Sequence, residues 1–349
     1  MRTLRKRALR TAAIGAAAFA AIGLLAGCTS DGTEGEDAID QGTSADENAA
    51  EGDTVVIGWS GPEADHGWLG AINSGALAAA EQFGDVELRQ AEGTNDASAQ
   101  IAAVEQFIND GVDAIVLLPT DGAALTQVAI SAMEAGIPVI NVDREFSDPA
   151  ASRVTILGDN YGMGVSAGRY ICEQLGGESD AIIGEIAGID SLPLTQDRSQ
   201  GFADGLAECG LEVGPRVAAD FTVAGGETAA SQLLSANPEL DAVWNHDDDQ
   251  GVGVLAAIEA AGRDEFFLVG GAGSVNMMDR IQADDSVIKA TVIYPSTQAA
   301  DGIALARLVA QEKTMSDLIT PSVPNRIVLD APVVTKDNVA DFIDLAFES

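Results

Sequence analysis

Basic residues, histidines, cysteines and aromatic side chains are all scarce in this 349-residue chain. Eighteen Lys and Arg face 55 Asp and Glu, a formal net charge of −37, and such a negative field repels the phosphates of DNA and RNA. Two His and three Cys supply little material for His-based catalysis or a zinc site. Aromatics make up 5% of the chain, but 46% is hydrophobic, which excludes a wholly disordered acidic protein. At about 100–200 residues per domain, the length suggests two domains.

Acidic residues are absent from the first 30 positions, which instead carry five Lys and Arg residues. An uncharged, Ala-rich apolar run from Thr11 to Gly27 follows this basic start. That order is typical of an export signal, and the run is shorter than the roughly 20 residues that a membrane-spanning helix prefers. Every later apolar stretch is interrupted by charge before it reaches that length, so we expect no other membrane span.

The apolar run ends in Leu25-Ala26-Gly27-Cys28, which resembles the processing signal of bacterial lipoproteins. The resemblance implies that residues 1–27 are a signal peptide and that Cys28 becomes the lipidated N-terminus. The chain would then be extracytoplasmic and anchored to a bacterial cell membrane. One acyl chain binds a membrane only marginally, whereas several on one Cys would anchor the protein stably. The alternative is a buried Cys in a membrane helix.

Residues 28–53 form a second segment of unusual composition. They are rich in Gly, Ser, Thr, Ala and acidic residues, and Ile39 is their one large aliphatic residue. Such a segment cannot bury enough apolar surface to fold. It is predicted to be a disordered acidic tether that holds the folded part away from the membrane.

From Thr54 onward, short apolar runs rich in Val and Ile alternate with segments of helical periodicity. The predicted strands are 54–59, 86–91, 114–118, 139–142, 154–157, 181–186, 213–220, 242–244, 266–269 and 288–293. The predicted helices are 68–83, 97–110, 122–135, 161–175, 194–209, 227–236, 251–261, 276–283 and 297–311. This alternation favours parallel strands joined by right-handed crossovers. The pattern restarts after Arg153, so we predict an α/β fold of two similar, doubly wound parallel-sheet domains.

An internal repeat supports two domains of the same topology. Residues 113–143 begin with Asp-Ala-Ile-Val and are predicted to form a strand, an Ala-rich helix and a second strand. Residues 241–272 begin with Asp-Ala-Val-Trp and repeat this order. Ala272 then stands where Asp143 stands in the first copy. Chance similarity between two Ala-rich segments is the alternative.

Polar and aromatic residues follow several of the predicted strands. Ligands of open α/β sheets bind beyond the carboxyl ends of the strands, so these positions are candidates for a site. Carboxylate and guanidinium groups bind sugar hydroxyls through charge-assisted hydrogen bonds, and aromatic rings stack on the apolar faces of a sugar. The candidates for substrate binding are Ser60, His66, Trp68, Asp143, Arg144, Arg198, Phe221, Asp247 and Tyr294. We predict no catalytic residue and no metal site, because the run Asp247–Asp249 lacks the alternate spacing of a calcium loop.

Five stretches carry a family resemblance. They are Gly111-Val112-Asp113-Ala114-Ile115, Gly136–Arg144, Gly158-Asp159-Asn160, Arg198–Phe202 and Asp247-Asp248. With them, the chain from Thr54 to about Lys336 resembles the sugar-binding proteins of ABC importers. The likeness is to the ribose/galactose type, which has the type I periplasmic-binding-protein fold.

The resemblance implies how the protein is built and what it does. Two lobes are joined by a three-strand hinge, the first comprising residues 54–158 and 295–322 and the second residues 159–294 and 323–349. Their closure captures a monosaccharide or similar polyol, which is delivered to a membrane permease powered by a separate ATPase. We expect a monomer that is not an enzyme, needs no cofactor and touches the membrane through its lipid alone. The residues implied to contact the sugar are Asp143, Arg144, Arg198 and Asp247, and those implied to stack on it are Trp68 and Phe221.

Three positions depart from the family pattern. Ala272 stands where relatives often carry Asp, and Asp247 stands where they often carry Asn. Leu118 replaces the Asn that precedes Pro in ribose-binding members. Without a carboxylate at Ala272, one sugar hydroxyl is unread or is read by another group, so the identity of the sugar stays open.

Each candidate residue also has a purely structural interpretation. Trp68 could belong to the core at a helix start, and Arg198 could be a solvated charge. Asp143 and Arg144 could form a structural ion pair. Asp247 could serve only as a helix cap, for which Asp is a preferred residue.

Rival functions share the same core. A receptor for a sugar-like signal molecule stays open, and so does an enzyme, which would need an acid–base pair in the cleft. A sugar-responsive repressor is excluded because an export signal and an acidic tether occupy the place of its DNA-binding headpiece. Cys172 and Cys209 lie on neighbouring predicted helices of an exported protein, which leaves a disulfide or two free thiols as outcomes.

Overall fold

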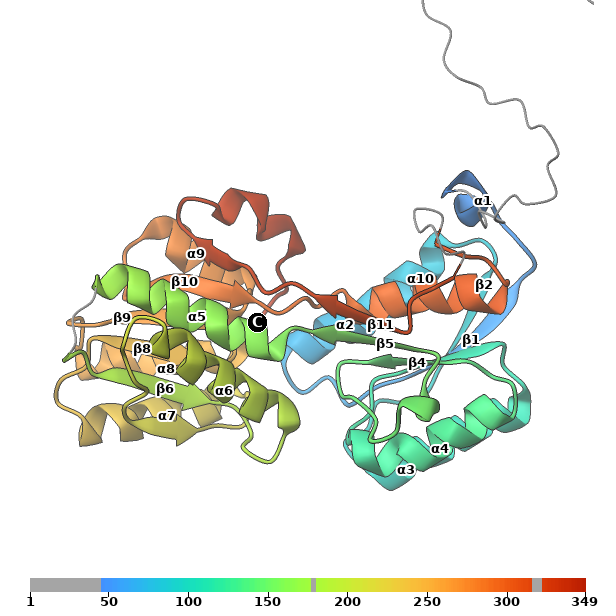
Figure 1. Ribbon diagram of the computed structural model, residues 1–349, viewed down its shortest axis with the longest axis horizontal. Helices are drawn as coiled ribbons and strands as arrows, with labels where there is room; N and C mark the ends of the chain where they lie inside the picture. Colours follow the sequence, from blue (N-terminus) through green and yellow to red (C-terminus); the bar gives the residue numbers. More distant parts are fainter. Residues whose placement is uncertain (1–44, 177–179, 316–321) are drawn as a thin grey trace, which may run out of the picture. The chain divides into compact units, whose positions relative to one another are not determined.

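The computed structural model describes residues 45–176, 180–315 and 322–349, so the expected signal peptide, Cys28 and most of the expected tether lie outside it. Two six-stranded sheets, each with its own helices, make up the described part (Figure 1). The first sheet has the order β11 (Arg326–Leu329), β5 (Val154–Gly158), β4 (Val139–Val142), β3 (Ala114–Leu117), β1 (Val55–Ser60) and β2 (Val86–Gln90). The second has the order β12 (Val333–Thr335), β10 (Ile288–Ile293), β9 (Phe267–Ala272), β8 (Ala242–Asn245), β6 (Ile183–Ala187) and β7 (Arg216–Ala218).

The two sheets share one topology. The order β2-β1-β3-β4-β5 of the first corresponds to β7-β6-β8-β9-β10 of the second, and all of these neighbours pair in parallel. This confirms the predicted fold class and agrees with the internal repeat. The sixth strands differ, because β11 runs parallel to β5 whereas β12 runs antiparallel to β10.

Helices connect the strands close to the predicted positions. The helices of the first lobe are α2 (Gly67–Gln82), α3 (Ala97–Asp110), α4 (Gly122–Glu134) and α10 (Gln298–Ala310). Those of the second are α5 (Asn160–Leu175), α6 (Pro193–Ala207), α7 (Val223–Ala236), α8 (Asp248–Ala261) and α9 (Val275–Ala283). Short 3-10 turns are η1 (Pro149–Ala151), η2 (Val339–Asp341) and η3 (Ile343–Leu345). Within the described ranges no helix is long and apolar enough to cross a membrane.

Local sequence signals set the ends of the helices. Asp96 caps α3 by accepting from the backbone N–H of Ser98 at 2.7 Å, and the left-handed Gly111 (φ 65°) ends the helix. Asp247 and Gly262 (φ 64°) do the same for α8 in the second lobe. A side-chain oxygen satisfies an orphan N–H at the helix start, and glycine adopts the left-handed conformation without a Cβ clash.

The central strands are buried on both faces. Every residue of β3, β4, β8 and β6 is buried, as expected for parallel strands that lie between layers of helices. Their near-continuous apolar sequence holds the backbone in place up to the carboxyl ends. The polar residues that follow these strands therefore start from a rigid platform.

The chain crosses between the lobes three times, and one predicted boundary is wrong. The crossings after Gly158 and at Tyr294 lie where we expected them. The third was expected after Ser322, but β11 pairs with β5 from Arg326 to Leu329, so the crossing follows Leu329. The short β11 belongs to the first lobe because its backbone groups complete the open edge of β5.

The end of the expected tether is also folded, contrary to the prediction for residues 28–53. A short helix, α1 (Ala45–Ala49), precedes a segment held by Arg307. The buried guanidinium donates to the carbonyls of Asn48 and Ala50 at 2.6 and 2.8 Å and forms an ion pair with Asp85 at 2.6 Å. These long-range contacts order a segment whose own composition offers little apolar surface to bury.

A disulfide joins Cys172 of α5 to Cys209, just beyond the end of α6, with their Cα atoms 6.0 Å apart. The two helices approach closely because glycines line their contact. A Cβ on Gly164 would lie 2.1 Å from the carbonyl oxygen of Arg198, and one on Gly201 would lie 2.1 Å from that of Tyr161. Close helix packing thus brings the two cysteines within bonding reach.

Candidate functional site

Asp143 and Arg144 follow β4 at the carboxyl edge of the first sheet. Asp143 has a left-handed backbone (φ 63°), its side chain is buried, and its carboxylate accepts from the hydroxyl of Tyr294. Arg144 donates through Nη1 to the carbonyl of Thr120 at 2.8 Å. Its Nε is buried, has no hydrogen-bond partner and lies 3.8 Å from Asp143 Oδ2. The pair therefore holds a free donor beside a carboxylate.

These two residues line a cleft of about 600 Å³ between the lobes. The first lobe contributes Thr120, Asp121, Gly122, Ala123, Asp143, Arg144, Glu145, Ser147, Leu157, Gly158, Arg326 and Val328. The second lobe contributes Asp159, Asn160, Tyr161, Ser191, Leu192, Pro193, Leu194 and Asp197. The lining is rich in carboxylates, and burial, with the charge of Glu145, raises the pKa of Asp197. A neutral polar ligand with many hydroxyls fits such walls better than an anion does.

Tyr294 lies on the second crossing between the lobes and contacts two residues that line the cleft. Its hydroxyl donates to Asp143 and accepts from Asn160 Nδ2 at 3.1 Å. Burial, followed by the charge of Asp143, raises the pKa of Tyr294 far above its ordinary value. The hydroxyl therefore stays protonated and links one residue from each lobe.

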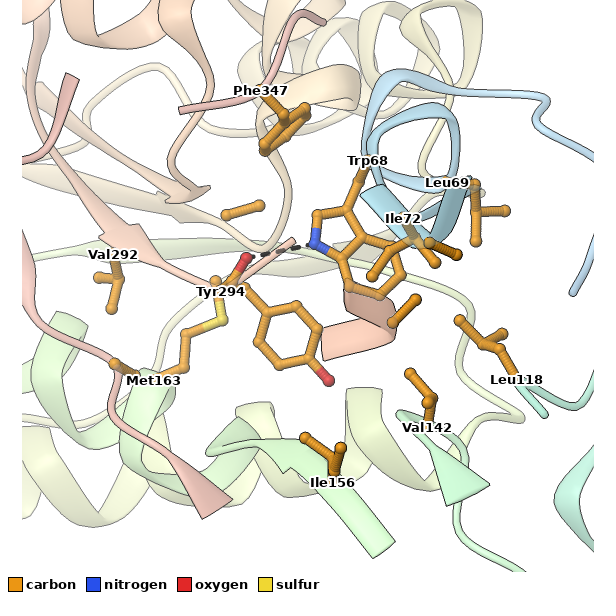
Figure 2. Close-up of a cluster of buried hydrophobic side chains, with 14 of the residues drawn as sticks. Trp68, Leu69, Ile72, Leu118, Val142, Ile156, Met163, Val292, Tyr294 and Phe347 are labelled. Carbon is orange, nitrogen blue, oxygen red and sulfur yellow. Dashed lines mark hydrogen bonds between the residues drawn. The ribbon is translucent and has the colours of Figure 1, made fainter. Parts of the chain in front are cut away.

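Trp68 packs against Tyr294 at the first turn of α2. The ring centroids are 5.4 Å apart, and Trp68 Nε1 donates to the backbone carbonyl of Tyr294 at 3.2 Å (Figure 2). Trp68 is buried in one hydrophobic cluster with Leu69 and Ile72. The structure thus places Trp68 against the ring of Tyr294. This agrees with the alternative that Trp68 is a core residue.

Arg198 is buried on α6, although it carries a charge. Its Nε donates to Asn160 Oδ1 at 2.9 Å and its Nη1 to the carbonyl of His246 at 3.0 Å. The guanidinium lies 4.5 Å from the centroid of the Tyr294 ring and 6.0 Å from that of Phe221. Phe221 has a left-handed backbone (φ 65°) and is half-buried. The guanidinium of Arg198 thus lies near the ring of Phe221, but neither residue lines the cleft.

Three consecutive acids open α8, and each has a different role. Asp247 is buried and caps the helix, accepting from the N–H of Asp249 at 2.8 Å; burial and the charge of Asp249 raise the pKa of Asp247 to about 6. Asp248 accepts from the N–H groups of Gly271, Gly273 and Ser274 at 2.8, 3.0 and 2.8 Å. Burial raises its pKa to about 8 against the pull of these donors. The first two acids thus serve the second lobe itself.

Asp249 reaches the first lobe, and our predicted site did not include it. Its carboxylate accepts from the backbone N–H of Trp68 at 3.0 Å and lies 3.0 Å from His66 Nδ1. Burial lowers the pKa of His66, but the hydrogen bond to Asp249 and the nearby charges of Asp247 and Asp249 outweigh it, so the pKa lies above its ordinary value. The predicted residue His66 is therefore half of a contact between the lobes.

Ser60 lies at the end of β1 and faces the interior of its own lobe. Gln100 Nε2 donates to its hydroxyl at 3.3 Å and to the carbonyl of Leu118 at 2.8 Å. Ser60 does not line the cleft. Asn160 and Arg326, by contrast, line it and were not among the candidates. The only sequence signal for Asn160 was its place in a family motif, and for Arg326 there was none.

Ala272 has the same type of backbone conformation as Asp143, its counterpart in the repeat. It ends β9 with a left-handed backbone (φ 85°), just as Asp143 follows β4 with φ 63°. The carbonyl of Ala272 accepts from the backbone N–H of Tyr294 at 3.1 Å. The second lobe therefore keeps the backbone of a site position but presents no carboxylate there.

Known proteins resemble most of the described chain. Residues 57–314 match the family model of the periplasmic binding protein domain. The ribose import binding protein of Bacillus subtilis is 32% identical over 229 residues, which are 64% of this chain and 72% of that protein. A protein of Mycobacterium smegmatis solved in complex with β-D-fucofuranose is 26% identical, with a TM-score of 0.74 over 83% of this chain and 94% of that one. The fructose-binding periplasmic domain of a hybrid two-component system is also 26% identical, with a TM-score of 0.71 over 83% and 93% of the two chains.

Proposed function

Because the chain belongs to the periplasmic binding protein family, we propose that it is an extracytoplasmic solute-binding protein of an ABC importer. It captures a monosaccharide or similar polyol and delivers it to the permease without turning it over. The observation that carries this proposal is the cleft in which Asp143 and Arg144 face Asn160 and Asp197 of the other lobe. Similarity to a ribose import binding protein and to a protein that holds a fucofuranose supports a sugar as the ligand.

We infer that the unpartnered Nε of Arg144 is the donor for the ligand's most specific contact. A sugar hydroxyl can accept from this buried N–H and donate to the carboxylate of Asp143, 3.8 Å away. Both bonds involve a charged partner, so they are stronger than bonds between neutral groups. The hydroxyl would also satisfy a buried donor that otherwise costs free energy.

Delivery to the permease requires that ligand binding changes the arrangement of the two lobes. Asp143 and Arg144 belong to the first lobe, whereas Asn160 and Asp197 belong to the second. A ligand can contact the residues of both lobes at once only when the lobes are close together. Its binding therefore shifts the population toward the closed form. The closed form would then dock on the permease.

We also propose that Cys28 carries the lipid that retains the protein at the membrane. The sequence Leu25-Ala26-Gly27-Cys28 supports this, and Cys28 lies outside the described residues. Growth with labelled palmitate tests it. We expect label in the native protein and none in Cys28→Ala, and a labelled Cys28→Ala protein would refute the anchor.

Calorimetry of the chain from Thr29 onward, against a panel of pentoses, hexoses and polyols, tests the proposed function. We expect at least one of them to bind, and to be recovered unchanged. Arg144→Met should weaken that binding by roughly 10–100-fold, because it removes a charged hydrogen bond. Arg280→Met is the matched control, since Arg280 is exposed and pairs with Glu259 outside the cleft. Failure of every sugar and polyol to bind would refute the proposal.

A receptor for a sugar-like signal is the second candidate function. The similarity to the fructose-binding periplasmic domain of a hybrid two-component system favours it. Uptake of the labelled ligand separates the two candidates. Deleting the gene should abolish uptake if the protein serves an importer, whereas a receptor mutant would keep uptake and lose the transcriptional response to the sugar.

A further inference from the structure

One side chain holds the aromatic and charged groups that the predicted sugar site requires. Tyr294 is 3% exposed and lies on the crossing from β10 to α10. Its ring packs against Trp68 of the first lobe, at 5.4 Å, and beneath the guanidinium of Arg198 of the second, at 4.5 Å. Its hydroxyl bonds to Asp143 and to Asn160. The residues predicted to contact the sugar therefore already contact Tyr294, a side chain of the protein itself.

The phenol has the features of a small, ring-shaped, hydroxylated ligand. It offers a flat apolar face to Trp68, as a sugar ring offers to an aromatic residue. Its hydroxyl donates to a carboxylate, as a sugar hydroxyl does. Its electron-rich face lies under Arg198, which a cation–π contact stabilises. The first two contacts are of the kind that a bound sugar makes. In place of the third, a sugar hydroxyl could accept a hydrogen bond from the guanidinium.

The two hydrogen-bond partners of the phenol line the cleft. Asp143 and Asn160 line it, but Trp68 and Arg198 do not. Figure 2 shows the Tyr294 ring next to Trp68, inside the buried cluster. The phenol thus contacts both kinds of group, those that line the cleft and the aromatic and guanidinium groups that do not.

The origin of this arrangement lies in the second lobe. Ala272 occupies the position equivalent to Asp143 and supplies no carboxylate, and its carbonyl accepts from the backbone N–H of Tyr294 at 3.1 Å. The hydroxyl of Tyr294 then bonds to the one carboxylate that remains, that of Asp143. Tyr294 thus contacts both positions that the repeat makes equivalent, Ala272 through its backbone and Asp143 through its hydroxyl.

We propose that Tyr294 is an internal competitor of the ligand, whose phenol occupies the place of a sugar ring against Trp68, Asp143 and Arg198. A ring-shaped sugar binds there by displacing it. The proposal rests on the proposed sugar-binding function and adds a selection rule to it. A ligand replaces the phenol only if it brings a hydroxyl to Asp143 and a flat apolar face to Trp68. A linear polyol lacks that face and stays in the outer cleft.

Calorimetry with D-ribose, D-galactose and the linear polyol ribitol tests the competition. Tyr294→Phe removes the phenol hydroxyl and keeps the ring, so a ring sugar no longer has to break the bond to Asp143. We expect roughly tenfold tighter binding of the ring sugar that the native chain binds best, and no gain for ribitol. Tyr170→Phe is the matched control, because Tyr170 lies in the second lobe away from the cleft and should leave affinity unchanged.

The outcomes separate this proposal from the proposed function. Native protein that binds a sugar, with equal or weaker binding in a folded Tyr294→Phe variant, would overturn the competition alone; weaker binding would make the hydroxyl a sugar contact. If the native chain binds another sugar of the panel, binding of D-ribose or D-galactose that is seen only in the variant would support the competition. Failure of both proteins to bind any sugar would overturn both proposals.

A second measurement follows Tyr294 in the native protein while sugar binds. Variants are used only to assign its signals. The chain has three Tyr, so ring-labelled tyrosine gives three sets of NMR signals, which Tyr→Phe changes assign. Saturating ring sugar should move the Tyr294 signals toward those of an exposed tyrosine and leave the Tyr170 signals in place. Tyr294 signals that stay unmoved at saturation would overturn displacement.

Discussion

The two lobes have one backbone plan and use their acidic residues differently. In the first lobe, Asp143 follows β4 and lines the cleft with Arg144. In the second, the equivalent Ala272 is apolar, and the buried acids at the start of α8 bind the lobe's own backbone or the other lobe. The comparison teaches that a duplicated scaffold preserves backbone geometry at the strand ends, while each lobe assigns its side chains separately to ligand or to structure.

Substitution of Asp248 should have the largest effect on stability, because its carboxylate holds the backbone on both sides of Ala272. Asp248→Ala leaves the N–H groups of Gly271, Gly273 and Ser274 buried without an acceptor, and should lower the free energy of unfolding by at least about 3 kcal/mol. Asp121→Ala removes a cap that accepts from Ala124 alone in the first lobe, and should cost about 1 kcal/mol. Urea unfolding measures both. Equal losses would mean that the acids of the two lobes have equivalent roles.

The disulfide is a further difference, since none joins residues of the first lobe in the part of the chain that is described. Replacing both Cys172 and Cys209 by Ser should lower the free energy of unfolding by about 2–4 kcal/mol, because the unfolded chain regains freedom. Reducing agent should lower the native protein to the same level and leave the double variant unchanged. A thiol assay should find no free thiol in the native chain from Thr29 onward, and two free thiols would contradict the pairing.

Ala272→Asp would restore the missing symmetry between the lobes. Asp tolerates the left-handed backbone of this position, and its carboxylate would offer a sugar a second charged acceptor. We expect about a tenfold change in affinity for a ring sugar and an altered order of preference across the panel. Ala283→Asp adds the same charge on an exposed helix end and serves as the control. An unchanged order of preference would show that this position does not read the ligand.

The pKa values of the two histidines should shift in opposite directions. The contacts with Asp249 raise the pKa of His66 above its ordinary value of about 6.5, whereas burial lowers that of His246 to about 4, against its hydrogen bond to Glu185. The contact of His66 therefore adds stability below about pH 6.5 and loses it as pH rises through the raised pKa. His246 makes stability fall as pH drops from about 6.5 toward 4, because the unfolded chain binds the extra proton.

NMR titration of the two imidazoles, assigned with His66→Gln and His246→Gln, checks these directions. His66→Gln should cost at most about 1 kcal/mol at pH 6 and less at higher pH, since it breaks a single contact at the edge between the lobes. Two histidines that titrate together near pH 6.5 would contradict the difference. An effect of His66→Gln that grows with rising pH would contradict the sign.

Local sequence patterns predicted most of the fold because burial and capping act over short distances. Strands such as 139–142 and 288–293, and the helix 97–110, are found at the predicted bounds. The third crossing was misplaced because β11 is a short edge strand in which exposed and half-buried residues alternate, so it shows no continuous apolar run. The fold of residues 45–53 was missed because it depends on Arg307, more than 250 positions away in the chain.

The candidate site was predicted in part. The rule that ligands bind beyond strand ends led to Asp143 and Arg144, and both line the cleft. It could not separate them from Arg198 and Trp68, which follow the same kind of local pattern but have Tyr294 against them. The rule also pointed to the run Asp247–Asp249, but we chose Asp247 alone for the predicted site, because three consecutive acids look alike until their partners are known.

Local patterns were enough to predict the export-like start, the alternating strands and helices, the repeat and the loss of a carboxylate at Ala272, because composition, periodicity and residue identity are local properties. Which of the polar residues remain available to a ligand depends instead on long-range contacts in the folded protein. Hydrogen bonds satisfy buried groups regardless of distance along the chain, and Tyr294 lies 151 positions from the Asp143 to which it bonds. Whether a residue faces ligand or protein is therefore a property of its partners, which no stretch of sequence around it contains.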